Sequence, residues 1–144
     1  MIDRGSAQPK DLERVERGAV RHRGHYTQLK DYSQLRYGLI TPSDIDGVLD
    51  FQNRAFVFLE LKFAGAEMSL GQRLMYERIC DACQRGGVNS VVIVANHSSA
   101  SDEMIPVHEL PVDRVRFKGK WSQMRPDDTV KSVIDRFHNK FTRT

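Results

Sequence analysis

The chain has 144 residues, a mass of 16.5 kDa and a formal net charge of +3, with 40% hydrophobic and 28% charged residues. These values fit one globular domain and exclude a collagen-like chain, a disulfide scaffold and a charge-dominated disordered chain. The longest strictly aliphatic run covers only residues 91–95, whereas a transmembrane helix needs about 20 apolar residues, so we expect no membrane partner.

The first part of the chain predicts a loose tail over residues 1–10 and a helix over 11–23, where apolar residues recur at helical spacing. Runs of apolar residues then predict two strands, 39–51 and 55–63. Because only residues 52–54 separate them, we expect a β-hairpin with a short loop.

The second half opens with a helix signal. Ser69 and Gln72 have the S-x-x-Q form of a capping box, which predicts a helix from this point to about Arg85. We expect four further elements, namely a buried strand, two more strands and a last helix: 90–96, 105–109, 112–118 and 127–140. This order predicts an α/β fold, with a central mixed β-sheet flanked by helices in a single domain over residues 11–144.

The two cysteines, Cys80 and Cys83, lie inside the expected helix. No second Cys or His pair stands at the spacing of zinc ligands, so we interpret both as free thiols. Free thiols fit a reducing compartment, and the N-terminus shows no apolar segment of a secretion signal. We therefore expect a cytoplasmic protein.

Two charged residues, Glu60 and Lys62, stand at the end of the second expected strand. Side chains alternate along a strand, so both point to the side that Phe56 and Phe58 also occupy. Burying an unpaired charge costs several kcal/mol, and a divalent cation is one natural partner for a buried carboxylate. A structural ion pair on an exposed strand is the simpler alternative.

The hairpin supplies candidates for a second metal ligand. If its loop is centred on Asn53, Asp46 faces Glu60 across the ladder and Asp44 faces Lys62. Opposed residues have Cβ atoms about 4.5–5.5 Å apart, and two carboxylates this close repel unless a cation lies between them. A register shift of two residues would bring Asp44 opposite Glu60 instead. Asp46 is therefore the first candidate and Asp44 the second.

This pattern resembles a known family. An Asp, a hairpin and then Glu60-x-Lys62 resemble the PD-(D/E)XK nucleases, the restriction-endonuclease-like superfamily. Gln72 and Tyr76 match the Q-x-x-x-Y motif of its RecB-like branch, which includes lambda-type exonucleases. Small phage-encoded endonucleases with an IDG…E-x-K…GQR pattern are also similar. The resemblance covers roughly residues 37–96. It departs from the family pattern where Ser43 separates the proline from the next aspartate.

The resemblance implies a restriction-endonuclease-like core and a site for Mg²⁺, for which Mn²⁺ can substitute. Asp46, Glu60 and the backbone carbonyl of Leu61 would hold the ion through hard oxygen ligands. Lys62 would orient or activate the attacking water. Gln72 would complete the catalytic set, although it could also serve only the capping box.

Two further residues have open roles. Tyr76 lies on the same helix face as the glutamine of the motif, where it could reach the site, the DNA backbone or simply the core. Glu16, on the first expected helix, could add an acidic ligand as in some relatives, and a solvated helix face is the alternative.

The resemblance implies a metal-dependent DNA nuclease, an endonuclease of low sequence specificity that acts in the cytoplasm, or in a host cytoplasm if it is phage-encoded. A Holliday-junction-type resolvase is an alternative, as is a non-cutting DNA-binding or assembly factor on the same fold. One site per chain suggests a homodimer or higher homo-oligomer if both DNA strands are cut.

The distribution of charge agrees with a DNA partner. Residues 112–144 carry 9 Lys and Arg against 4 Asp and Glu, whereas residues 37–111 carry 5 against 10. Four cations alternate with other residues along the expected strand: Arg114, Arg116, Lys118 and Lys120. On one strand face they would contact phosphates. The alternative is an edge strand guarded by positive charges.

Overall fold

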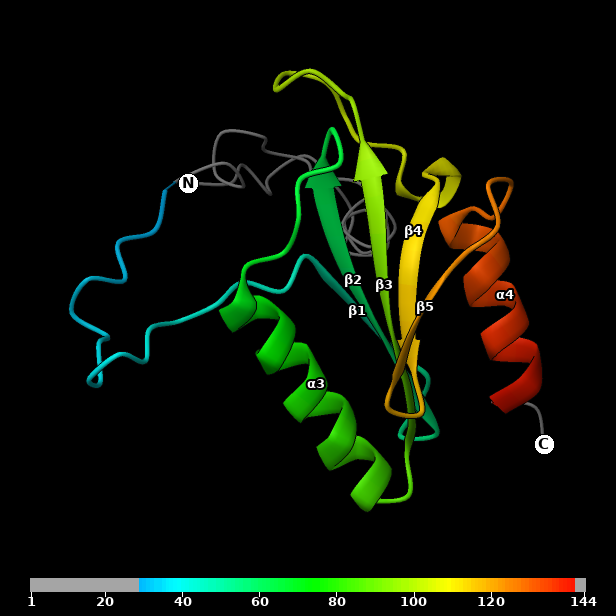
Figure 1. Cartoon of the computed structure of the whole chain (residues 1–144), viewed down its shortest axis with the longest axis horizontal. Coiled ribbons are helices and arrows are strands. Elements are labelled where there is room, and N and C mark those ends of the chain that lie inside the picture. The colour runs from blue at the N-terminus through cyan, green and yellow to red at the C-terminus, as the bar shows by residue number, and fades with distance from the viewer. Residues whose placement is uncertain (1–28, 142–144) are drawn as a thin grey trace, which may run out of the picture. The chain divides into compact units, whose positions relative to one another are not determined.

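The computed structural model describes residues 29–141 (Figure 1). The chain divides into two compact units, residues 1–42 and 43–144. The second unit contains these elements: β1 (Gly47–Asp50), β2 (Ala55–Phe63), α3 (Leu70–Arg85), β3 (Asn89–His97), the 3-10 helix η1 (Val107–Glu109), β4 (Val112–Phe117), β5 (Lys120–Gln123) and α4 (Val130–Phe141). The expected tail, the expected first helix and Glu16 lie outside the described residues.

Residues 29–42 of the first unit contain an isolated bridge. The N–H groups of Tyr37 and Ile40 donate to each other's carbonyl oxygens at 2.9 and 3.0 Å. No strand begins at residue 39 as expected, and β1 starts only at Gly47. The prediction for the start of this strand is therefore wrong.

The five strands form one mixed sheet in the order β1-β2-β3-β4-β5. Strands β2 and β3 are parallel, and the other neighbouring pairs are antiparallel. A parallel pair needs a crossover connection, which α3 supplies between β2 and β3. Helices α3 and α4 lie against opposite faces of the sheet (Figure 1). The expected α/β fold with a mixed sheet flanked by helices is confirmed.

Alternating side chains of the central strands build two cores. On the α4 side, Val57 and Ile93 pack with Phe137. On the α3 side, Phe58 packs with Tyr76. Strand β3 is buried over most of its length, as expected for a strand covered on both faces. Among residues 29–141, neither helix is long and apolar enough to cross a membrane.

The β1–β2 hairpin has the expected register. Its pairs are Gly47–Leu59, Val48–Phe58, Leu49–Val57 and Asp50–Phe56. This is the register of a loop centred on Asn53. Gln52 and Asn53 have left-handed φ angles of 56° and 64°, and the Phe51 carbonyl accepts the Arg54 N–H at 3.1 Å, so the three residues 52–54 form a tight loop. The same register places Asp46, just before β1, level with Glu60.

Two strands expected in the second half differ from the structure. Residues 107–109 form η1, because Pro106 starts a tight turn in which its carbonyl accepts the N–H of Glu109 at 3.0 Å. The strand expected over 112–118 ends at Phe117. Lys118 and Gly119 have φ angles of 50° and 79° and reverse the chain into β5.

The last helix begins three residues later than expected, at Val130. The Thr129 hydroxyl accepts the Ser132 N–H at 3.2 Å, and the Ser132 hydroxyl accepts the Thr129 N–H at 2.9 Å. This reciprocal pair satisfies donors of the first turn. Before it, the Asp128 carboxylate accepts the Arg125 N–H at 3.2 Å and keeps the chain in a turn.

Candidate active site

Helix α3 begins beside the end of β2, and its first turn has the expected capping box. The Ser69 hydroxyl accepts the Gln72 N–H at 3.2 Å, and the Ser69 N–H donates to Gln72 Oε1 at 3.4 Å. These bonds satisfy orphan donors at the helix start. They also fix the direction of the Gln72 side chain, which reaches over the sheet.

Glu60 lies at the centre of the candidate site and is only 3% exposed. Its Oε1 accepts Gln72 Nε2 at 3.1 Å and lies 3.1 Å from Lys62 Nζ. Its Oε2 accepts the Tyr76 hydroxyl at 2.6 Å. A buried carboxylate needs such donors to offset its lost hydration. Glu60 and Lys62 do form an ion pair, but it does not lie on an exposed strand, because both side chains are largely buried.

Lys62 and Gln72 complete this arrangement. Lys62 Nζ donates to Gln72 Oε1 at 2.9 Å, so the amide accepts from the ammonium and donates to the carboxylate of Glu60. Gln72 therefore belongs to the capping box and to the site at once. Both roles that the sequence allowed for Gln72, in the capping box and in the candidate site, are therefore present together.

Tyr76 is fully buried and lies one helical turn after Gln72. Burial is the main cause that raises the pKa of its phenol far above the ordinary value, and the hydrogen bond to Glu60 acts in the same direction. The phenol therefore stays protonated and serves as a donor. Its expected roles, core packing and contact with the site, are both present.

Asp46 stands at the rim of this cluster. Its Oδ2 accepts the backbone N–H of Leu61 at 2.7 Å. Although the residue is exposed, partial burial of its carboxyl raises the pKa, and the charge of Glu60 raises it further, while the Leu61 N–H and Lys62 oppose the rise. This hydrogen bond also explains the late start of β1, because the Asp46 side chain takes a donor that a longer strand would have used.

The other two aspartates of this segment lie further out. Asp44 is exposed, and its charge contributes to the raised pKa of Asp46. Asp50 Oδ1 accepts the N–H of Asn53 at 3.1 Å, which makes it a turn residue. The structure thus groups Asp46 with Glu60, Lys62 and the helix residues, and it places Asp50 away from them.

The oxygen donors gathered here are of the kind that a hard divalent cation uses. The N–H of Leu61 points toward Asp46, and the carbonyl of the same residue points to the same side of the strand. The ladder with β1 begins at the Gly47–Leu59 pair, so this carbonyl lies outside it. Two carboxylates and a carbonyl suit Mg²⁺, which commonly uses one or two protein carboxylates and keeps several waters. Residues 29–141 contain no cluster of three or more Asp, Glu, His or Cys at metal-binding distance. Asp46 and Glu60 are therefore the two carboxylates that would supply the negative charge for such an ion.

The four cations expected on one strand face do not lie together. Arg116 is 6% exposed, and its guanidinium donates to Asp81 at 3.0 Å and to the Glu77 carbonyl at 3.4 Å. Arg116 thus fastens β4 to α3 instead of facing solvent. Lys118 lies in the β4–β5 turn and Lys120 on the next strand. That expectation is wrong, because the strand ends before its third cation.

We expect Arg116→Ala to lower the free energy of unfolding by about 1–3 kcal/mol, the usual range when a buried hydrogen-bonding group loses its partners. Lys118→Ala removes the same charge from an exposed turn and should change the free energy by less than about 0.5 kcal/mol. Urea unfolding of both variants measures the difference. Equal, small effects would show that the bond to Asp81 contributes little to stability.

Tyr76→Phe should lower the free energy of unfolding by about 1–3 kcal/mol, because Glu60 Oε2 loses its donor in a buried place. Tyr37→Phe, which removes the same hydroxyl from a residue that is 71% exposed, is the matched control and should be close to neutral. Thermal and urea unfolding check this. A neutral Tyr76→Phe would mean that another donor replaces the phenol.

A groove adjoins the site and was not anticipated from the sequence. It consists of two hollows that share Glu67 and Arg114, and its other lining residues include Arg73 and Trp121. The sequence contained one signal for it. Arg114, one of its lining residues, is among the cations for which the sequence predicts phosphate contact.

Comparison with protein-family models, with curated proteins and with solved structures finds no match to this chain.

Proposed function

We propose that this protein is a metal-dependent nuclease that hydrolyses DNA phosphodiester bonds, as an endonuclease with low sequence specificity. One observation supports this best. The buried Glu60 meets Lys62 and Gln72 at the end of β2, with Asp46 on the adjoining segment. The resemblance to the PD-(D/E)XK pattern assigns function to these same residues.

In this proposal each residue has a distinct task. When bound by Asp46, Glu60 and the Leu61 carbonyl, Mg²⁺ or Mn²⁺ supplies Lewis-acid activation of the scissile phosphate and of a water. Lys62 holds its ammonium beside Glu60, where it orients the attacking water and offsets charge on the phosphate. Gln72 keeps that ammonium in place through its Oε1.

The direct test is cleavage of supercoiled plasmid with Mg²⁺, with Mn²⁺ and with EDTA. We expect nicked circles with either metal and intact plasmid with EDTA. Nicks on a closed circle identify an endonuclease, whereas cleavage confined to linear DNA would identify an exonuclease. No cleavage of circular, linear, single-stranded or branched DNA with either metal would overturn the proposal.

DNA is the partner that this function requires, and we place the activity in the cytoplasm. One candidate site is present in the described part of each chain, so cutting both strands at one place requires two chains. We propose that a homodimer makes double-strand breaks. Light scattering of the protein with and without DNA tests this. A protein that stays monomeric while it makes double-strand breaks would contradict it.

A further inference from the structure

The groove beside the candidate site has an unusual lining for a DNA-binding surface. Its two hollows measure about 230 and 380 Å³, and the larger one falls at the lower end of the size range of small-ligand sites. Two cations, Arg73 and Arg114, are balanced by two carboxylates, Glu67 and Asp113. A groove for phosphates alone would carry a clear positive excess. This one combines balanced charge with an indole, Trp121.

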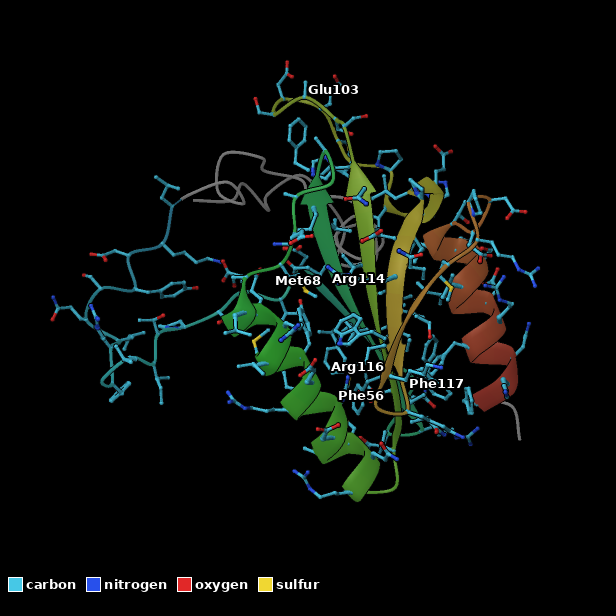
Figure 2. All side chains as sticks on the ribbon, in the orientation of Figure 1. Phe56, Met68, Glu103, Arg114, Arg116 and Phe117 are labelled. Atoms are coloured by element: carbon cyan, nitrogen blue, oxygen red, sulfur yellow. The ribbon has the colours of Figure 1, made fainter. Side chains whose placement is uncertain are left out.

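The groove lies on the same face of the sheet as the candidate site. Glu60 pairs with Val94, and Val94 pairs with Arg114, so these three side chains form one row across neighbouring strands. Adjacent strands are about 4.8 Å apart, which places Arg114 roughly 10 Å from Glu60 along the row. Figure 2 labels Arg114 on β4 and Met68 beside the start of α3, and both residues line one hollow.

The aromatic and planar groups in the groove are held in place. The Trp121 Nε1–H donates to Glu77 Oε1 at 2.9 Å, and Arg73 Nε lies 3.8 Å from the same oxygen. The Arg114 guanidinium lies 5.6 Å from the centre of the indole ring. Flat guanidinium and aromatic groups provide stacking surfaces for nucleobases, with little dependence on sequence. The carboxylates can accept from base amino groups.

We propose that this groove binds an unpaired nucleobase next to the scissile phosphate, so that each DNA strand is cut where it is single or locally unpaired. The inference rests on the proposed nuclease function and specifies its substrate. A DNA strand whose phosphate occupies the site at Glu60 carries its neighbouring base to Arg114 and Trp121. Stacking there is tolerant of base identity, which agrees with low sequence specificity.

The chain contains one tryptophan, so the intrinsic fluorescence of the full-length protein reports on Trp121. We expect a single-stranded oligonucleotide, added in EDTA to prevent cleavage, to quench this fluorescence. An abasic oligonucleotide of the same length carries the same phosphates without bases, and it should leave the fluorescence nearly unchanged. A blunt duplex should quench much less than the single strand. Equal quenching by the abasic strand, or no quenching by the single strand, overturns the inference.

Substitutions at Arg114 separate stacking from charge. We expect Arg114→Ala to weaken single-strand binding, measured by anisotropy of a labelled oligonucleotide, about tenfold. Arg114→Lys keeps the charge but lacks the planar group and should also weaken it. The control Lys131→Ala removes a charge from an exposed position on α4 and should leave binding unchanged. Equal weakening by Arg114→Ala and Lys131→Ala, or full binding by Arg114→Lys, overturns the stacking role.

The quenching test and the plasmid test fail independently. Base-dependent quenching in a protein that cuts nothing with Mg²⁺ supports the groove and overturns the nuclease. Metal-dependent cleavage without base-dependent quenching supports the nuclease and overturns the groove.

Discussion

Lys62→Ala is expected to abolish DNA cleavage while DNA binding survives. The Lys62 ammonium lies 3.1 Å from Glu60 Oε1 and 2.9 Å from Gln72 Oε1, so its loss removes the cation nearest the proposed reaction. A missing group of this kind raises the barrier by several kcal/mol, and each 1.36 kcal/mol is about tenfold in rate. The measurement is plasmid nicking with Mg²⁺, together with oligonucleotide binding in EDTA.

Two controls separate catalysis from stability. Lys131→Ala removes a charge of the same kind from a side chain that is 63% exposed and should cut at the wild-type rate. Urea unfolding shows whether the Lys62→Ala protein is folded, since Gln72 and Tyr76 still donate to Glu60. A folded Lys62→Ala protein that cuts at nearly the wild-type rate would overturn the nuclease assignment.

Asp46→Asn is expected to remove activity and to weaken Mn²⁺ binding, because the amide supplies no charge and is a poorer ligand. Asp44→Asn should leave partial activity, since Asp44 is exposed and affects the site only through its charge. Asp50→Asn should be nearly neutral, because Asp50 bonds to the hairpin turn. Calorimetric titration of Mn²⁺ and plasmid cleavage compare the three variants. An inactive Asp44→Asn beside an active Asp46→Asn would reverse the order of the two ligands.

Asp46→Asn should also stabilise the protein in the absence of metal. The folded-state pKa of Asp46 is raised above 3.8, chiefly by burial, so the protonated form favours folding. That contribution is present at acid pH and is lost as pH rises through the raised pKa. At neutral pH the ionised carboxylate therefore opposes folding. Asparagine keeps an oxygen for the Leu61 N–H without the charge, so Asp46→Asn should unfold at a higher urea concentration than wild type in EDTA.

A related pH dependence follows for the metal. Protons and Mn²⁺ compete for the Asp46 carboxylate, and the raised pKa makes the proton the stronger competitor. As pH falls, Mn²⁺ affinity should decline earlier than it would for an unperturbed aspartate. Titrations across mildly acid pH measure this, and an affinity that stays constant until the pH falls below 3.8 would contradict a raised pKa at the Asp46 carboxylate.

The site could be predicted from local patterns because its parts lie close in sequence. The hairpin register follows from the centre of the short loop at Asn53, and the observed pairing of Asp50 with Phe56 agrees with it. The capping box placed Gln72 at the helix start, and helical spacing placed Tyr76 on the same side. Each of these relations spans only a few residues, so the sequence determines them strongly.

The errors occur where long-range contacts or side-chain hydrogen bonds override the local pattern. The start of β1 depends on Asp46 bonding to Leu61, which no apolar alternation shows. The burial of Arg116 depends on Asp81, 35 residues away in the chain. The turn requires a left-handed φ angle at Lys118, a residue type that rarely adopts one, so the lysine itself carries no turn signal.

Helix α3 contributes Gln72 to the candidate site from its first turn, and terminal turns are the parts of a helix that fray. Its first turn is held by Ser69 and Gln72, and Gln72 also positions the groups on β2. Terminal turns open at a lower free-energy cost than the body of a fold. Opening this one turn would withdraw Gln72 from Lys62 and Glu60 while the sheet and both cores stay intact. Inactivation and unfolding are therefore separable events. On gradual addition of urea, catalytic capacity should disappear before the circular dichroism of the sheet changes.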